Sequence, residues 1–457
     1  MRRNVRLVGA GEDIPCPDAA RKRIMDRRPR LSSGDGRSGS TPNRSPVTQR
    51  RILITYPYPL GRATGGARMT REIARHLGRA GARVTILPVS ANFLRGIFPR
   101  SGPEPEALGF EFDQELARDG VDIVRVAQHP LHWVLDAQNV RDAVGRILGE
   151  ERVDAVLGYY KEAARLPRLL RRHEVTFGYI STWQSYAKAL QARAGGVPRF
   201  LTGSVNRRVA IRPHRLADVL FATSRFTRNE LVEHFGVERD RIVVCPLGVQ
   251  PGFFDVAHEP SPGITRLLFF GRVIAAKGVG DAIEALGALA RRGAPPFELR
   301  LVGQGWHDWA RGLARRHGIA DRVDLHGPVG DQELREHLSW AYAAVLPSHF
   351  EAFGLAFAEA QAAGLPVIAY AAGSVPEVVL DGTTGWLAPV HDVQALAGCL
   401  EAALTDEAEI RRRGVAARER VHREFTWQNT AATILAGLDR VRAPDRSALA
   451  ASSTTGT

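Results

Sequence analysis

The chain has 457 residues, of which 44% are hydrophobic, so it is long enough to form two domains that each bury a core. No run approaches the ~20 consecutive apolar residues that a membrane-spanning helix needs. A secretory signal peptide requires an apolar segment after its basic residues, and the basic residues near this N-terminus are not followed by one. The three cysteines show no metal-ligand spacing and argue against a disulfide framework. We therefore expect a cytoplasmic protein.

The positive charge is unevenly distributed. The formal net charge is +13, and residues 1–50 contribute +7 of it, which leaves +6 for the other 407 residues. A basic tail on a mildly basic chain does not indicate nucleic-acid binding by itself, and no zinc finger, RNA-recognition motif or basic zipper is found. We expect no nucleic-acid partner.

Two segments share the same order of predicted elements. In the first, a buried strand at 52–56 is followed by a glycine-rich loop at 61–66, a helix with its apolar residues on one face, and a strand at 84–87. The order restarts with a strand at 267–270, a loop at 271–278, an amphipathic helix and a strand that begins at residue 299. Strand, helix and strand in this order build parallel sheets, so the sequence predicts an α/β fold with two doubly wound domains.

Glycine and proline gather between these two units and predict a linker there. Residues 1–49 are rich in Arg, Ser, Gly and Pro without apolar periodicity, which predicts disorder. The expected organisation is a disordered extension at 1–49, an N-terminal domain at 50–247, a linker at 248–264, a C-terminal domain at 265–426, a terminal helix at 427–442 that packs back on the N-terminal domain, and a disordered tail at 443–457.

The segment 345–388 places polar residues between a strand and a helix. After the strand, a loop carries Glu351 and Gly354. A helix begins near Leu355 and presents Glu359 just over one turn later. The first amides of such a helix have no internal partner and bind anions, whereas a carboxylate such as Glu359 suits the hydroxyls of a ribose.

A second cluster lies at the first strand-to-helix loop of the C-terminal unit. Gly271-Arg272 and Lys277-Gly278 place two cations beside a helix N-terminus. This arrangement suits a diphosphate, and it would stabilise the charge of a diphosphate leaving group.

These motifs, in this order and spacing, closely resemble those of retaining glycosyltransferases of family four. The resemblance covers roughly residues 51–440 and also includes Gly65-Gly66, the run 222–254, Pro347-Ser348, the run 373–379 and Gly385. It implies the GT-B fold, with two Rossmann-like domains facing across a cleft. It further implies transfer of a sugar, with retention at the anomeric carbon, from a nucleoside diphosphate sugar to an acceptor hydroxyl in polysaccharide, glycolipid or glycoconjugate synthesis.

The resemblance also assigns roles to residues of this chain. Arg272 and Lys277 would hold the donor pyrophosphate and Glu351 the transferred sugar, and these three are the expected catalytic residues. Donor binding would come from the ribose ligand Glu359, the amides of Phe353, Gly354 and Leu355, the loop with Gly65 and Gly66, and the base-flanking Gly327 and Val329. No Asp-x-Asp occurs in the chain, so neither a bound metal nor a cofactor is expected.

The chain departs from the family pattern at two places. Ala352 stands where the family usually has glycine, which is tolerable unless the position needs a positive φ. Ser181-Thr182-Trp183 follows a strand of the first domain where many members carry a histidine. The second departure leaves activity expected but puts sugar recognition in doubt.

Several alternatives stay open. A nucleotide-sugar epimerase of the same fold, or a catalytically silent nucleotide-sugar-binding protein, would share much of this pattern. Glu377 either touches the donor or is an acid favoured at a helix start. The run 188–215 has seven basic residues and no acid, so it is either a solvated face or a patch that rests on anionic lipid at the inner face of the membrane. The acceptor is a glycan, a lipid-linked molecule or a small molecule.

Overall fold

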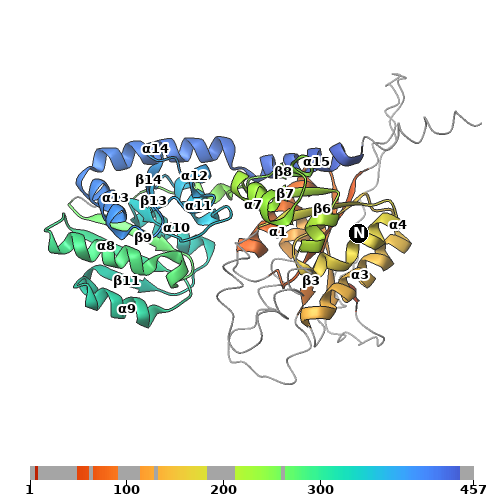
Figure 1. The fold of residues 1–457 in the computed structure, drawn as a ribbon, viewed down its shortest axis with the longest axis horizontal. Coiled ribbons are helices and arrows are strands. Elements are labelled where there is room, and N and C mark those ends of the chain that lie inside the picture. Colours follow the sequence, from red (N-terminus) through yellow and green to blue (C-terminus); the bar gives the residue numbers. More distant parts are fainter. Residues whose placement is uncertain are drawn as a thin grey trace, which may run out of the picture.

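The computed structural model describes residues 6–8, 49–60, 65–90, 114–127, 132–182, 211–258 and 263–442. They form two parallel sheets, each flanked by helices, so the predicted fold class is confirmed (Figure 1). The expected tail at 443–457 and most of the expected extension at 1–49 lie outside the described residues.

The N-terminal half is built on a sheet with strand order β1-β4-β3-β2-β5-β6-β7-β8, in which every pairing is parallel. Its strands are β1 (Arg6–Val8), β2 (Arg51–Tyr56), β3 (Arg83–Ser90), β4 (Val121–Ala127), β5 (Ala155–Gly158), β6 (Thr176–Ser181), β7 (Val219–Ala222) and β8 (Ile242–Val244). Its helices are α1 (Gly65–Arg79), α3 (His132–Glu150), η2 (Lys161–Arg165), α4 (Leu166–Arg172), α7 (Arg225–Phe235) and η3 (Arg239–Arg241).

The C-terminal half is built on a second parallel sheet, with order β11-β10-β9-β12-β13-β14. Its strands are β9 (Thr265–Phe270), β10 (Phe297–Val302), β11 (Val323–His326), β12 (Ala343–Val345), β13 (Val367–Tyr370) and β14 (Gly385–Ala388). Its helices are η5 (Ala275–Lys277), α8 (Val279–Arg291), α9 (His307–Arg316), η6 (Ala320–Arg322), α10 (Asp331–Trp340), α11 (Leu355–Ala362), α12 (Val375–Val378), α13 (Val393–Thr405) and α14 (Glu407–Glu424).

Both sheets reverse their strand order beside their first long strand. β2 lies between β3 and β5, and β9 lies between β10 and β12. Connections leave such a point toward opposite faces of the sheet, and ligands of doubly wound folds bind at the carboxyl ends of the strands there. Most of the predicted site residues lie in the loops that follow β2, β9 and β12 or in the helices that these loops lead into, so the topology places these residues at the two reversal points.

The last helix crosses from one half to the other. α15 (Trp427–Arg442) follows the whole C-terminal half and contacts α1, β6 and β7 of the N-terminal half (Figure 1). Beside the crossing, the amide of Val249 donates to the carbonyl of Phe425 at 2.9 Å. A Cβ on Gly248 would lie 2.1 Å from the nitrogen of Trp427, so only glycine fits. The segment after β8 and the start of α15 therefore run side by side between the halves.

Two details differ from the sequence expectations. Arg6–Val8, inside the extension expected to be disordered, forms β1 and pairs with β4. These three residues extend the sheet beyond the edge of β4. α1 begins at Gly65, so Gly65 and Gly66 belong to its first turn instead of the preceding loop.

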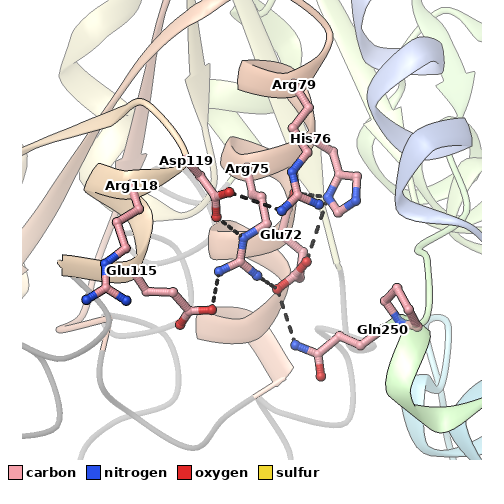
Figure 2. A pocket seen from close by; sticks show the side chains of 9 residues that line it. Glu72, Arg75, His76, Arg79, Glu115, Arg118, Asp119 and Gln250 are labelled. Atoms are coloured by element: carbon pink, nitrogen blue, oxygen red, sulfur yellow. Dashed lines mark hydrogen bonds and ion pairs between the residues drawn. The ribbon is translucent and has the colours of Figure 1, made fainter. Parts of the chain in front are cut away.

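A network of charges lies where α1 meets the segment after β8. It surrounds a pocket of about 390 Å³ (Figure 2). Arg75 donates to Glu72 at 2.5 Å, to Glu115 at 2.6 Å and to Asp119 at 2.5 Å, and Gln250 donates to Glu72 at 3.2 Å. Because its central cation is matched by carboxylates and Gln250 ties the connecting segment to α1, this network is structural. None of the predicted donor residues lines the pocket.

Candidate active site

The loop between β12 and α11 is held from both halves of the molecule. The carbonyl of Ala352 accepts hydrogen bonds from three hydroxyls of the N-terminal half, at 2.7 Å from Ser224 and at 3.2 Å from Thr223 and Thr227. The carbonyl of Glu351 accepts from the amide of Ser374 at 3.0 Å. The backbone of the loop is thereby fixed.

Ala352 fits this loop without backbone strain. Among the described residues, only Glu174 and His391 are non-glycine residues with a positive φ. The extra methyl group at Ala352 is therefore tolerated, as expected from the sequence.

Lys277 and Glu351, predicted to share the site, form an ion pair. The Nζ of Lys277 lies 2.5 Å from Oε1 of Glu351, and both side chains are largely buried. Gly278 allows this approach, because it has a φ of 70° and a Cβ there would lie 1.9 Å from the carbonyl oxygen of Pro347. The loop after β9 and the loop after β12 are therefore in backbone contact, which brings the cation to the carboxylate.

The N-terminus of α11 faces the start of α1. Gly354, with a φ of 87°, precedes the helix, and Leu355 is its first residue. A Cβ on Gly65 would lie 3.6 Å from the side chain of Leu355, so the start of α1 lies close to the start of α11. Gly66 is confined on its other side, since a Cβ there would lie 2.9 Å from the hydroxyl of Tyr159. The ring of Phe353 packs edge-on against Phe425, so this side chain belongs to the core.

Glu359 is buried and paired with Arg68 of the other half. Arg68, on α1, donates to Glu359 on α11 and to Asp331 on α10. Burial lowers the pKa of the Arg68 guanidinium, but these two carboxylates raise that pKa by more, so it lies above its usual value. Gly327 and Val329 lie between β11 and α10, a few residues before Asp331. Arg68 thus joins the predicted ribose ligand to the start of α10, the helix that follows the predicted base-flanking residues.

Arg272 stands apart from the other predicted residues. It is exposed in the loop between β9 and η5. Within the described part of the chain it makes no ion pair, in contrast to Lys277, so its charge is available to a ligand.

Glu377 has a structural partner. Its carboxylate accepts hydrogen bonds from the amides of Arg225 at 2.8 Å and Phe226 at 2.7 Å, at the start of α7. It therefore caps a helix of the N-terminal half, where the helix dipole favours a negative charge. Neither reading from the sequence named this contact between the halves, and donor contact by Glu377 stays a prediction.

The strand end without the family's histidine is filled differently. The hydroxyl of Ser181 lies 3.3 Å from Nε2 of the buried His214, and Thr182 donates to the hydroxyl of Tyr159 at 3.2 Å. Trp183 lies outside the described residues. An imidazole thus reaches this strand end from the segment just before β7, although the expected position holds serine.

The buried carboxylate of Glu162 lies next to Tyr159. Oε1 of Glu162 accepts from the hydroxyl of Thr55 and from the amides of Tyr159 and Tyr160, at 3.1 to 3.2 Å. Its Oε2 has no hydrogen-bond partner among the described residues. Burial raises the pKa of Glu162 to about 7.

Arg68, Asp331 and Glu162 were missed by the sequence analysis. Arg68 follows Gly66 by two residues and so points from the first turn of α1. Asp331 is an acid at a helix start, a common position that carries little signal. Glu162 follows Lys161 and precedes two alanines, a pattern that a solvent-exposed acid shares. None of the three could be assigned without knowing which elements meet.

Comparison with known proteins matches both halves of the chain. Residues 64–248 match the glycosyl transferase 4-like domain, and residues 257–420 match the glycosyl transferases group 1. A glycogen synthase of Mycobacterium tuberculosis strain H37Rv is 30% identical over 397 residues, which cover 84% of this chain and 92% of that protein. A D-inositol 3-phosphate glycosyltransferase of Xylanimonas cellulosilytica is 36% identical over 241 residues, which cover 48% of this chain and 56% of that protein.

Solved structures share the fold at low sequence identity. A sucrose-phosphate synthase from Thermosynechococcus elongatus aligns with a TM-score of 0.68 and 20% identity over 86% of this chain and 100% of that one. The Anabaena protein HepE in complex with UDP aligns with a TM-score of 0.65 and 18% identity over 85% and 100%. Among the described residues, no helix is both long and apolar enough to span a membrane. The chain belongs to the glycosyltransferases of group 1, and it is a glycosyltransferase with the GT-B fold.

Proposed function

We propose that the protein transfers a sugar, with retention and without a catalytic metal, from a nucleoside diphosphate sugar to an acceptor hydroxyl. One observation carries this proposal. Lys277 and Glu351 are paired at the carboxyl edge of the second sheet, beside the N-terminus of α11 and opposite Gly65. A cation, free helix amides and a carboxylate at one place suit a ligand that joins a diphosphate to a polyhydroxyl ring.

Each group has a role in this reaction. Arg272, Lys277 and the first amides of α11 bind the pyrophosphate and stabilise the charge that grows on it as its bond to the anomeric carbon breaks. Glu351 accepts hydrogen bonds from the sugar and Glu359 from the ribose, while Gly327 and Val329 flank the base. The acceptor oxygen bonds to the anomeric carbon, and its proton passes to the departing phosphate oxygen.

The first experiment identifies the donor. The full chain is heated with a panel of nucleoside diphosphate sugars, including UDP-glucose and ADP-glucose, because a ligand of the native state raises the melting temperature. The donor that stabilises most is then incubated with glycan and lipid-linked acceptors, and the anomeric configuration of the product is read by NMR. Full turnover after chelation supports a metal-independent transfer.

The same assay separates the alternatives. An epimerase converts its nucleotide sugar without an acceptor, and a silent binding protein is stabilised by the donor but forms no product. Acceptor-dependent release of nucleoside diphosphate excludes both, whereas an inverted product would refute retention.

Membrane contact through 188–215 is a separate proposal, and residues 183–210 lie outside the described part of the chain. Seven basic residues near anionic lipid would each contribute ~1 kcal/mol, so binding would be reversible and sensitive to salt. A protein truncated to begin at Arg51 is sedimented with anionic and with neutral vesicles. Binding to the anionic vesicles alone, lost when Arg207, Arg208 and Arg212 become Glu, supports contact at the inner face of the membrane. No binding at low salt would favour a soluble acceptor.

A further inference from the structure

Two imidazoles and a carboxylate meet beside the loop that carries Glu351. Asp281 comes from the first turn of α8, His349 from the loop after β12 and His391 from the loop after β14. One potential ligand atom of each residue lies within 4.8 Å of the other two. Three separate segments of the C-terminal half therefore bring the side chains together at the carboxyl edge of its sheet.

The spacing is close to that of a metal site. Zinc–ligand bonds of 2.0–2.2 Å place neighbouring ligand atoms of a tetrahedral site about 3.3 Å apart. Nε2 of His349 already lies 3.1 Å from Oδ2 of Asp281. The ring centroid of His391 is 4.3 Å from that of His349, and His391 is exposed, so a small side-chain movement completes the set.

The ligand atoms are supported by a second set of contacts. The buried Tyr370 donates its hydroxyl to Oδ2 of Asp281 at 2.9 Å, and the amide of His349 donates to the carbonyl of Ala276 at 3.1 Å. Hydrogen bonds to a ligating carboxylate orient it and are typical of metal sites in proteins.

The backbone at His391 adds an independent observation. His391 has a φ of 68°, a left-handed conformation that glycine adopts without strain. A histidine placed there costs backbone free energy, and strained residues gather at functional sites. The side chain of His391 is exposed and its ring contacts His349 and Tyr370 of the same cluster, so a ligand role accounts for an imidazole at this strained position.

We propose that Asp281, His349 and His391 bind a divalent transition-metal ion such as Zn²⁺, with a fourth position open to water. Two nitrogen ligands and one oxygen ligand favour zinc over magnesium or calcium, which prefer oxygen ligands alone. The ion would join α8 to the loop that precedes Glu351 and to the loop before α13. This site departs from the sequence expectation of no bound metal. It is independent of the proposed function, because metal binding is measured without turnover.

The test is calorimetric titration of the chelator-treated full chain with Zn²⁺, and separately with Mg²⁺. One Zn²⁺ per chain is expected, with far weaker Mg²⁺ binding. Loss of one ligand in His349→Ala or His391→Gly should weaken Zn²⁺ binding by at least ~100-fold. Co²⁺ should give the visible absorption of a tetrahedral site in the wild type and lose it in both variants.

His391→Gly keeps the test sharp, because glycine fits the local backbone. This variant should melt at or above the wild-type temperature without metal, and it should lose the rise in melting temperature that Zn²⁺ causes. The matched control is His234→Ala, which removes a histidine from a second potential cluster with Glu230 and Glu233 on α7. Unchanged Zn²⁺ binding in both site variants, or its loss in His234→Ala alone, would overturn the proposal and leave Asp281 and His349 as an ordinary hydrogen-bonded pair.

Discussion

Arg68 and Glu359 form an ion pair that joins the two halves of the molecule, with Arg68 on α1 and Glu359 on α11. The oxygen of Glu359 that accepts from Arg68 belongs to the carboxylate proposed to bind the ribose. Arg68 and the donor therefore compete for the same acceptor. This competition makes the pair a measurable part of donor binding.

Replacing Arg68 with Met should tighten the binding of the free nucleoside diphosphate. Glu359 is buried but Arg68 is 21% exposed, and an ion pair that reaches solvent through its cation contributes about 1 kcal/mol, so its removal as a competitor should improve affinity by roughly fivefold. Calorimetry in the wild-type and Glu359→Gln backgrounds checks this, because the gain should vanish when Glu359 is already replaced. Weaker binding by Arg68→Met alone would show instead that Arg68 is itself a donor ligand.

Glu359→Gln should weaken nucleoside diphosphate binding by ~1.5–3 kcal/mol, since it removes charge-assisted hydrogen bonds to hydroxyls. The matched control is Glu377→Gln, whose carboxylate caps α7. The control should lower the melting temperature and leave the affinity as it is. Equal affinities in the two variants would reduce Glu359 to a partner of Arg68.

Arg272→Ala and Lys277→Ala should each lower kcat/KM by at least ~100-fold, because each removes a cation that stabilises the departing diphosphate. Steady-state kinetics with the donor found by thermal shift provide the measurement. Arg316→Ala, an exposed arginine at the end of α9, is the control for a general loss of positive charge. Turnover near the control level in both site variants would contradict the mechanism.

Gly373→Ala should lower kcat by at least ~10-fold with little change in nucleoside diphosphate affinity. Gly373 has a φ of 60°, and a Cβ there would lie 2.3 Å from the carbonyl oxygen of Glu351, so the substitution displaces the sugar-binding loop. Gly382→Ala carries similar backbone strain, with a φ of 72°, but meets open space. It should lose stability and keep its kcat, so a matching loss of kcat in both variants would mean that backbone strain alone is responsible.

Glu162 should make stability depend on pH. Burial raises its pKa in the folded protein from 4.5 to about 7, so the native state holds its proton more tightly than the unfolded chain does. Its contribution to stability is therefore full below pH 4.5 and is lost as pH rises through about 7. Glu162→Gln mimics the protonated form. Between pH 5 and pH 8 its free energy of unfolding should therefore rise, relative to that of the wild type, by up to about 3 kcal/mol. Urea unfolding of both proteins at pH 5 and at pH 8 checks this. A difference in unfolding free energy that is the same at the two pH values would contradict it.

The sequence predicted the fold well because its signals are local. Strand, glycine loop and amphipathic helix recur in short windows, and the pair Lys277 and Glu351 was placed by motifs at the ends of two neighbouring strands. Topology then determines their contact, since β9 and β12 are adjacent in the second sheet.

The remaining features depend on how distant segments meet. Arg68 pairs with a residue 291 positions away, and Glu377 caps a helix that begins 152 positions earlier. No local pattern carries these pairings, because they arise from the docking of one half on the other. Glu162 was missed because it is buried against another strand of its own half, where it accepts from Thr55 of β2, 107 positions earlier.

The crossing of α15 has a consequence for synthesis on the ribosome. Its buried Ile434 and Leu438 cover the N-terminal half, and a Cβ on Gly437 would lie 2.6 Å from the ring of Phe221, so the packing is close. Residues 249–426 must be translated before this helix exists, which takes roughly 10–35 s at ~5–20 residues per second. A nascent chain therefore exposes the apolar face of its N-terminal half throughout that interval, and a ribosome that stalls within the C-terminal half leaves that face uncovered and prone to aggregate.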